Sequence, residues 1–169
     1  RLGLAALMEA AGIDAANLDE ESIGFIIGPR LNAVGRLEDA GPGAELMLSF
    51  DEVKIAELVA YIQEKNVERQ GIVQSIHEEA SAELAKNESM PDVVVLGSKN
   101  WHEGVLGIVA SKLVEEFGRP AILFRINEKT GIAKGSARST EPSDIYSALT
   151  DSKDLLAKFG GHTMAAGMS

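Results

Sequence analysis

Apolar residues recur at helical spacing along the middle of the chain. From Ser49 to Asn87 the sequence contains no proline and only one glycine, Gly71. An uninterrupted stretch with an apolar stripe is typical of a long amphipathic helix, here with Ser49 or Asp51 as the N-cap. The stripe falls into two groups, Ile55, Leu58, Val59 and Ile62, followed by Val73, Ile76, Ala80 and Leu84.

Two polar residues, Asn66 and Arg69, interrupt the stripe in the middle of this helix. A helix of about 36 residues would span roughly 50 Å, which is more than a compact domain of this size needs. We therefore expect the helix to leave one hydrophobic core and enter another at this polar waist. An alternative is that Asn66 and Arg69 hold a domain interface beside a functional site.

Shorter helical patterns, separated by glycine and proline, precede the long helix. We expect Gly28-Pro29 to end one of them, because proline lacks the backbone N–H that a helix interior needs. Gly41-Pro42-Gly43 breaks the pattern again. The predicted elements are helices at residues 1–12, 19–27 and 44–48, with a polar loop at the edge of a core at residues 30–40.

Beyond Pro91 the pattern changes to short β-branched runs. Residues 92–97 are predicted to form a buried strand, and residues 104–117 an apolar helix that Gly118 ends. A second strand at 120–126 completes a β-α-β unit, which implies a parallel strand pair with a right-handed crossover. The remaining predicted elements are a hairpin turn at residues 127–131, a strand at 132–139, short helices at 142–149 and 152–158, and one last strand at 159–167.

These patterns predict the α/β class. A helical tail and a long connecting helix are expected to lead into a small mixed β-sheet domain that contains the β-α-β unit.

The composition excludes several kinds of site. The chain has 169 residues, of which 45% are hydrophobic and 25% charged, as is ordinary for a folded protein. The absence of cysteine rules out disulfides, thiolate metal sites and thiol nucleophiles. No apolar run approaches the length of a membrane span and no secretory signal is visible, so we expect a soluble, cytoplasmic protein.

The charge is unevenly distributed along the chain. The formal net charge is −10, yet residues 91–169 carry 9 acidic and 9 basic side chains, whereas residues 1–90 carry 17 acidic and 7 basic ones. A net acidic chain is not a general coat for nucleic acid. A local group of Arg and Lys in the neutral second half can still hold phosphates.

Three segments combine glycine with polar side chains, at residues 98–104, 135–139 and 160–162. Ligands of α/β sheets gather beyond strand ends, where helix N-termini present N–H groups to anions. Arg138 lies between serines on a strand of small residues and can offer a bidentate fork to a phosphate, and His162 can add a donor or a proton. Structural alternatives are Trp101 as a core lid, Arg138 as a surface ion-pair partner and His162 as a strand-end hydrogen bonder.

Several catalytic patterns are missing from the sequence. Metal-assisted hydrolysis needs clustered carboxylates and histidines, but His77, His102 and His162 have no such neighbours. The chain also lacks a Walker loop, a G-x-S-x-G elbow and a dinucleotide-binding fingerprint. We therefore expect no catalytic residue and no bound metal in this chain, which alone should be inactive.

Five motifs in order resemble the RecJ family of bacterial single-stranded-DNA-specific exonucleases, within the DHH phosphoesterase superfamily. Each motif is weak by itself, but their order over nearly the whole chain is specific. The motifs are Gly28–Arg36, Asn66-x-x-Arg69-Gln70, Trp101–Ser111, Gly135–Ser139 and Phe159–Gly167.

The resemblance implies that the chain, which begins at Arg1 in a helical pattern, is a piece of a longer protein. Residues 1–50 would be the C-terminal tail of the catalytic DHH domain, residues 51–88 the long connecting helix, and residues 89–169 a C-terminally truncated DHH-associated substrate-binding domain. Mn²⁺ or Mg²⁺ would be held by an Asp-His-His domain upstream. In the parent protein, metal-activated water would attack a 5′-terminal phosphodiester and release mononucleotides, in DNA repair and recombination.

The same resemblance implies roles for individual residues toward single-stranded DNA. Arg138 with the hydroxyls of Ser136 and Ser139 would bind backbone phosphate, and His162 would approach the scissile phosphate. The full set of expected nucleic-acid-binding residues is Asn32, Arg36, Trp101, His102, Ser136, Arg138, Ser139, Gly160, Gly161 and His162. No membrane is implied, and single-strand-binding proteins or helicases are candidate partners of the parent protein.

Two alternative functions are considered, one for another enzyme of the same superfamily and one for a relative without catalytic activity. An oligoribonuclease or cyclic-dinucleotide phosphodiesterase of the same superfamily would share the glycine-histidine motif, but usually carries an extra glycine there and lacks the pattern of Trp101–Ser111. A non-catalytic relative that only binds single strands would be distinguished by a degraded Asp-His-His cluster.

Overall fold

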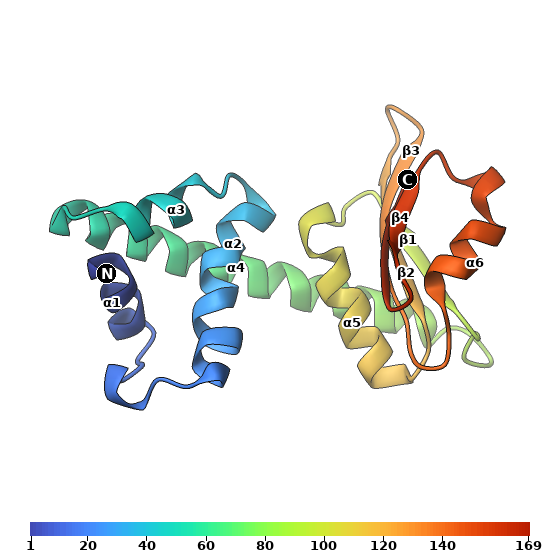
Figure 1. The fold of residues 1–169 in the computed structure, drawn as a ribbon. Coiled ribbons are helices and arrows are strands. Elements are labelled where there is room, and N and C mark those ends of the chain that lie inside the picture. Colours follow the sequence, from blue (N-terminus) through green and yellow to red (C-terminus); the bar gives the residue numbers. More distant parts are fainter. The chain divides into compact units, whose positions relative to one another are not determined.

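The computed structural model describes residues 1–169 and divides them into two compact units, Arg1–Gly71 and Ile72–Ser169 (Figure 1). The boundary between the units falls inside the long helix α4, Glu52–Leu84. Each unit has its own hydrophobic cluster, and each is described by itself. None of the helices is both long enough and apolar enough to cross a membrane.

The first unit is entirely helical. The first half of α4 buries Ile55, Val59 and Ile62 against the shorter helices, together with Leu7 of α1 and Leu46 of α3. Asp51 caps α4, since its carboxylate accepts the backbone N–H groups of residues 53 and 54. The short elements are α1 (Leu2–Ala10), a 3-10 turn (Ala15–Asn17), a π-helix (Ser22–Ile27), α2 (Gly28–Leu37) and α3 (Gly41–Leu48).

Three expectations for this unit are wrong. Gly28-Pro29 does not end a helix, because the π-helix continues directly into α2. Of the segment 30–40 expected as a loop, only residues 38–40 lie outside α2. Pro29 occupies the first turn of α2, where its missing N–H is tolerated. Gly41-Pro42-Gly43 is likewise the first turn of α3 rather than a break before it.

The polar waist of α4 is a small buried cluster. Asn66 is 4% exposed, and its side-chain oxygen accepts a hydrogen bond of 3.1 Å from Nη2 of Arg69. Burial, and secondarily the nearby guanidinium of Arg36, lower the pKa of Arg69. The interruption of the apolar stripe is therefore a partly buried polar contact and not a solvated stretch.

The second unit is built on a five-stranded mixed sheet in the order β1-β2-β3-β5-β4. β1 and β2 are parallel, as the β-α-β pattern predicted, and every other neighbouring pair is antiparallel. The strands are β1 (Val94–Ser98), β2 (Ala121–Asn127), β3 (Ile132–Arg138), β4 (Phe159–His162) and β5 (Ala165–Met168). The α/β class with a helical segment and a small mixed sheet is thereby confirmed.

The end of the chain differs from the single strand expected at residues 159–167. It forms a hairpin in which β4 and β5 pair, with β5 inserted between β3 and β4. Thr163 and Met164 make the turn without the Asn-Gly or Asp-Gly signal that usually marks one, so the alternating pattern reads as continuous. The predicted short helices shrink to α6 (Ile145–Asp151) and a 3-10 turn (Lys153–Leu155).

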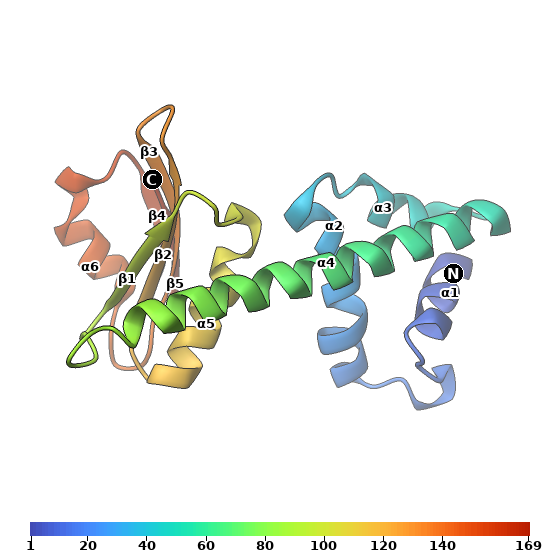
Figure 2. The same cartoon turned by 180° about the vertical axis from the view of Figure 1, so that it is seen from behind.

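Helices cover both faces of the sheet (Figures 1 and 2). α5 (Leu106–Phe117) follows a 3-10 turn (Glu103–Val105), packs on β2 and β3, and ends at Gly118 in the left-handed conformation, φ 64°. The last turns of α4 lie on the α5 side, where His77 pairs with Glu116 at 2.8 Å. α6 covers the opposite face, over Ala137, Ala166 and Met168.

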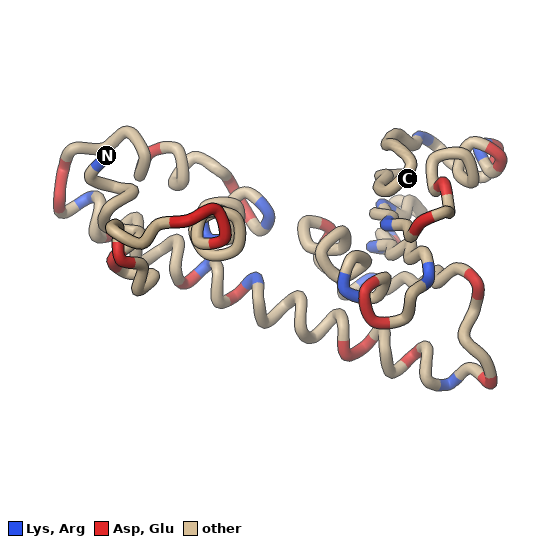
Figure 3. The backbone as a smooth tube through the Cα atoms, turned by 60° about the horizontal axis from the view of Figure 1, so that its bottom comes forward, with Lys and Arg blue, Asp and Glu red and all other residues tan.

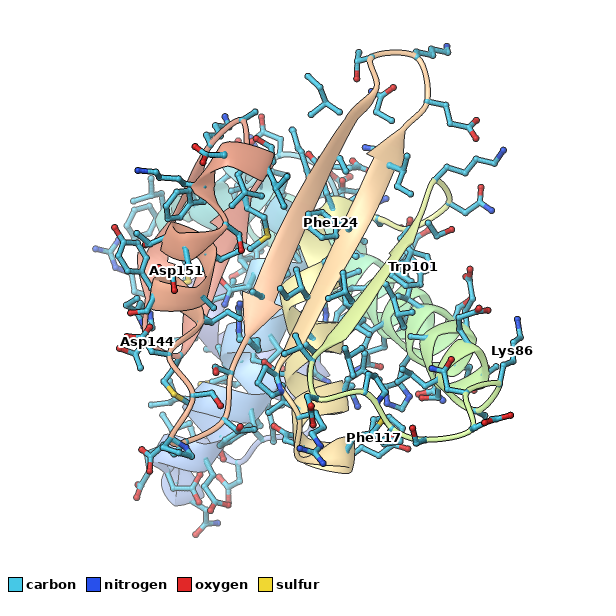
Figure 4. All side chains as sticks on the ribbon, turned by 90° about the vertical axis from the view of Figure 1, so that its right-hand side faces the viewer. Lys86, Trp101, Phe117, Phe124, Asp144 and Asp151 are labelled. Carbon is cyan, nitrogen blue, oxygen red and sulfur yellow. The ribbon has the colours of Figure 1, made fainter.

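We expect Gly135→Ala to destabilise the second unit. An added methyl group at this position would lie 2.5 Å from the ring of Phe124 and 2.7 Å from Sδ of Met168. Figure 4 shows the position of Phe124 on the sheet. Overpacking of this kind costs about 1–3 kcal/mol. Urea unfolding followed by fluorescence of Trp101, which is 4% exposed and the only tryptophan, measures it. Gly160→Ala is the control, since nothing lies within 4 Å there, and equal midpoints for the two variants would contradict the prediction.

The N-cap of α6 makes stability depend on acidity. Hydrogen bonds from the backbone and hydroxyl of Ser147, and from the N–H of Tyr146, lower the pKa of Asp144 below its ordinary value of 3.8. A carboxylate with a lowered folded-state pKa stabilises the fold above 3.8, and that contribution is lost as the pH falls through the folded-state pKa.

Asp144→Asn keeps a good capping side chain but removes this titration. We expect the melting temperature of the original chain to exceed that of the variant at neutral pH. The difference between the two melting temperatures should shrink as the pH falls below about 4. Thermal melts over a pH series measure this difference. A difference that is constant with pH would mean that the charge of Asp144 contributes nothing to stability.

Candidate nucleic-acid interface

The alternation of β3 sorts its side chains onto the two faces of the sheet. Gly135 and Ala137 face α6, whereas Ser136 and Arg138 face α5. Nη1 of Arg138 donates to Oγ of Ser136 at 3.3 Å and to the carbonyl of Ala137 at 2.7 Å. The guanidinium and the hydroxyl therefore lie together on the α5 side of the sheet.

Gly107, in the first turn of α5, makes room for this pair. A methyl group at Gly107 would lie 2.7 Å from Nη2 of Arg138 and 3.0 Å from Oγ of Ser136. The absence of a side chain thus lets the guanidinium rest against the first turn of α5. The N–H groups of residues 104–106 are taken up by the turn before α5, so the cation and the hydroxyl are the donors that suit an oxyanion.

A hollow of about 590 Å³ opens beside Ser136. Its walls come from the turn before α5, from β3, and from the β4–β5 hairpin, and Gly160 and Gly167 leave part of it without side chains. It has the size of a small-ligand pocket. Its lining residues are Glu103, Gly104, Leu106, Lys134, Gly135, Ser136, Lys158, Phe159, Gly160, Gly167, Met168 and Ser169.

The Phe159–Gly167 motif forms the hairpin that borders this hollow. Gly161 is required by packing, because an added Cβ would lie 2.4 Å from the carbonyl oxygen of Ala165. His162 is exposed, and its Nδ1 accepts a hydrogen bond of 3.4 Å from the N–H of Met164. Its register partner Ala165 is also the partner of Arg138, so His162 and Arg138 share one row, about 10 Å apart between backbones.

Three expected site residues have structural hydrogen-bond partners of their own. Ser139 is 4% exposed and donates to the carbonyl of Ser143 at 2.9 Å, so its hydroxyl does not join that of Ser136. Trp101 is 4% exposed and its indole N–H donates to Glu79 at 2.8 Å, which fits the alternative of a core lid (Figure 4). Nδ1 of His102 accepts the N–H of Gly104 at 3.2 Å and caps the turn before α5.

The first unit holds Asn32 and Arg36 on its helix α2. They are one turn apart and both exposed, so they share a face of that helix. Arg36 also lies near Arg69, whose pKa it helps to lower. This places the guanidinium of Arg36 and the amide of Asn32 on the surface of the first unit, near the partly buried guanidinium of Arg69.

Sequence reasoning overlooked Gly107, Lys134 and Lys158. Lys134 precedes Ser136 and Arg138 at the strand period of two, a signal that was readable from the sequence. Gly107 could not be found that way, because its role depends on the distance between α5 and β3. Figure 3 shows basic positions gathered over the sheet of the second unit.

The side chains of the described residues do not form a metal site. No three His, Asp or Glu side chains lie close enough to hold an ion. His77 is paired with Glu116, and His102 serves as a cap. Metal chemistry is therefore not assigned to any residue of this chain.

The chain is similar in sequence and in structure to known proteins. Residues 90–169 match the DHHA1 domain. The single-stranded-DNA-specific exonuclease RecJ of Bacillus subtilis is 45% identical over 169 residues, which is 100% of this chain and 22% of that protein. A crystal structure of RecJ in complex with Mg²⁺ from Thermus thermophilus superposes with a TM-score of 0.87 at 32% identity, over 99% of this chain and 25% of that one. The same protein in complex with Mn²⁺ gives a TM-score of 0.86.

The chain thus spans about a quarter of the length of the relatives it matches. Residues 90–169 match the DHHA1 domain, and the chain as a whole is similar to one segment of the RecJ exonucleases.

Proposed function

We propose that residues 89–169 hold single-stranded DNA for a metal-dependent 5′-to-3′ exonuclease that acts in DNA repair and recombination. The observation that carries the proposal is the position of Arg138 and Ser136 against the first turn of α5, where Ser136 also lines the glycine-containing hollow. The names of the relatives, single-stranded-DNA-specific exonucleases, support this substrate over a cyclic dinucleotide or an oligoribonucleotide.

The chemistry of the site suits a phosphodiester. A guanidinium binds phosphate oxygens through parallel N–H groups, and the hydroxyl of Ser136 adds a further donor. Because the guanidinium already contacts the hydroxyl and a carbonyl of its own strand, it is held in place before a ligand arrives. A preoriented cation loses less side-chain entropy on binding.

The hollow suits an unpaired strand. Gly160 and Gly167 let a sugar-phosphate backbone approach the sheet closely. The ring of Phe159 lies on the other face of the sheet, against Tyr146, so the proposed contacts are to the phosphates and not to the bases. In this proposal His162, at the end of β4, lies toward the reacting phosphate.

The remaining assignments follow the same proposal. Residues 1–50 are the tail of the catalytic domain, residues 51–88 the connecting helix, and Asn32 and Arg36 contact the same class of ligand. Hydrolysis in the parent protein depends on Mg²⁺ or Mn²⁺ from outside these 169 residues, so the role of this chain is to bind and orient. The cytoplasm, where single strands arise during repair, is the proposed location.

Arg138→Ala tests the function directly. Loss of the charge-assisted bonds should weaken binding of a 5′-phosphorylated single strand by about 1–3 kcal/mol, which is about fivefold to 150-fold. Fluorescence anisotropy at several salt concentrations measures it, alongside the matching duplex, which should bind more weakly. Arg119→Ala, which removes a guanidinium paired with Asp92 instead, should have little effect. Equal affinity of the Arg138 variant and the original chain would remove this site from the function.

Gly107→Ala separates binding from stability. Alanine is favoured over glycine in a helix, so the variant should be as stable as the original chain or more stable. Its methyl group displaces the guanidinium of Arg138, so affinity for the single strand should nevertheless fall. Gly71→Ala has the same helical preference with nothing within 4 Å and should bind normally. Unchanged affinity of the Gly107 variant would mean that the position of Arg138 in this structure is not the binding position.

A further inference from the structure

Two cations lie directly opposite each other on β2 and β3. Arg125 and Lys134 are register partners in the antiparallel pair, so their side chains leave the same face of the sheet. By strand alternation this is the face of Ser136 and Arg138. Like charges in this arrangement repel each other, and an anion between them offsets that repulsion.

Glu103, in the turn before α5, supplies that anion. One of its carboxylate oxygens lies 3.3 Å from Nζ of Lys134, and the other lies 3.9 Å from Nη1 of Arg125. The side chains of Glu103, Arg125 and Lys134 are 42%, 46% and 62% exposed. Ion pairs this exposed are weak, so another anion can replace the carboxylate.

The three residues lie where two hollows meet. Glu103 and Lys134 line both the hollow beside Ser136 and a second one of about 300 Å³, which Arg125 also lines. A ligand that continues from the first hollow into the second passes over Lys134. Lys134 and Arg138 are four residues apart on an extended strand, about 13 Å, so a single phosphate cannot reach both.

We propose that Arg125 and Lys134 form a second phosphate subsite, and that Glu103 occupies it as an internal anion that the DNA strand displaces. The proposal rests on the proposed function, because it concerns the same strand farther along its path. The first subsite, at Ser136 and Arg138, holds one phosphate, and the second holds another. The carboxylate competes with the second phosphate and therefore lowers the affinity of the chain for its ligand.

Binding of the 169-residue chain to a 5′-phosphorylated oligothymidylate, long enough to cross both hollows, tests the proposal in a salt series. Glu103→Gln keeps the shape of the side chain and removes its charge, so affinity should rise about twofold to fivefold. Lys134→Gln should weaken binding and reduce the slope of log affinity against log salt by about 0.7, as expected for one lost phosphate contact to a single strand. With a dinucleotide, which occupies only the first subsite, both effects should vanish.

Matched controls remove the same charges elsewhere in the second unit. Glu83→Gln breaks an exposed pair with Lys86 on α4, and Lys153→Gln alters the turn after α6, on the opposite face of the sheet. In a chain that carries both Arg125→Gln and Lys134→Gln, adding Glu103→Gln should no longer raise the affinity.

These measurements distinguish failure of the second subsite from failure of the proposed function. A gain for Glu103→Gln no larger than for Glu83→Gln, or a salt slope unchanged in Lys134→Gln, would overturn the second subsite. If Arg138→Ala weakens binding while these variants do not respond, only the second subsite is lost. If the unaltered chain does not bind the oligonucleotide even at low salt, the proposed function and the second subsite fall together.

Discussion

The second unit depends on the strict alternation of β3, a strand that has neighbours on both sides. Every second residue must be small or apolar to pack beneath α6, and the residues between them are left to face α5. On that second face the chain places Lys134, Ser136 and Arg138. Because the strand is fixed by β2 on one side and by β5 on the other, the polar side chains start from a rigid backbone. A binding group on such a scaffold loses little conformational entropy when its ligand arrives.

The second unit also depends on glycines that let neighbouring segments pack closely. Gly107 allows α5 to lie against Arg138, Gly135 accommodates the ring of Phe124, and Gly161 allows β4 to pair with β5. At Gly135 and Gly161 an added methyl group would meet a packed ring or the backbone, so these two positions tolerate little substitution, whereas at Gly107 it would displace only the end of the Arg138 side chain. The glycines of the hollow, Gly160 and Gly167, differ from them, because no atom crowds the first and only the carbonyl of Gly135 lies near the second. Their exposed backbone is available to a ligand rather than taken up by packing.

Much of the fold could be predicted from periodicity, and part of the site could not. α4 and the β-α-β unit follow from long, regular patterns, and Arg138 stands out because a guanidinium between serines is unusual on a strand of small residues. Pro29 was misleading, because proline is tolerated in the first turn of a helix as well as beyond its end. The β4–β5 hairpin was missed, because its turn at Thr163-Met164 contains no glycine or asparagine. Ser139 and Trp101 have suitable chemistry, but their burial depends on tertiary packing that no local pattern encodes.

The insertion of β5 between β3 and β4 has a consequence for motion. The strands β1, β2 and β3, with α5, form a continuous set of hydrogen bonds that does not need the last hairpin. β5 joins this set through only four residue pairs, and β4 is joined only through β5. The hairpin is also held from the side of α6, because Ala166 and Met168 are buried with Ile145 and the N–H of Ile145 donates to the carbonyl of Thr163. Any local opening that removes this wall of the hollow therefore has to move α6 and the hairpin together.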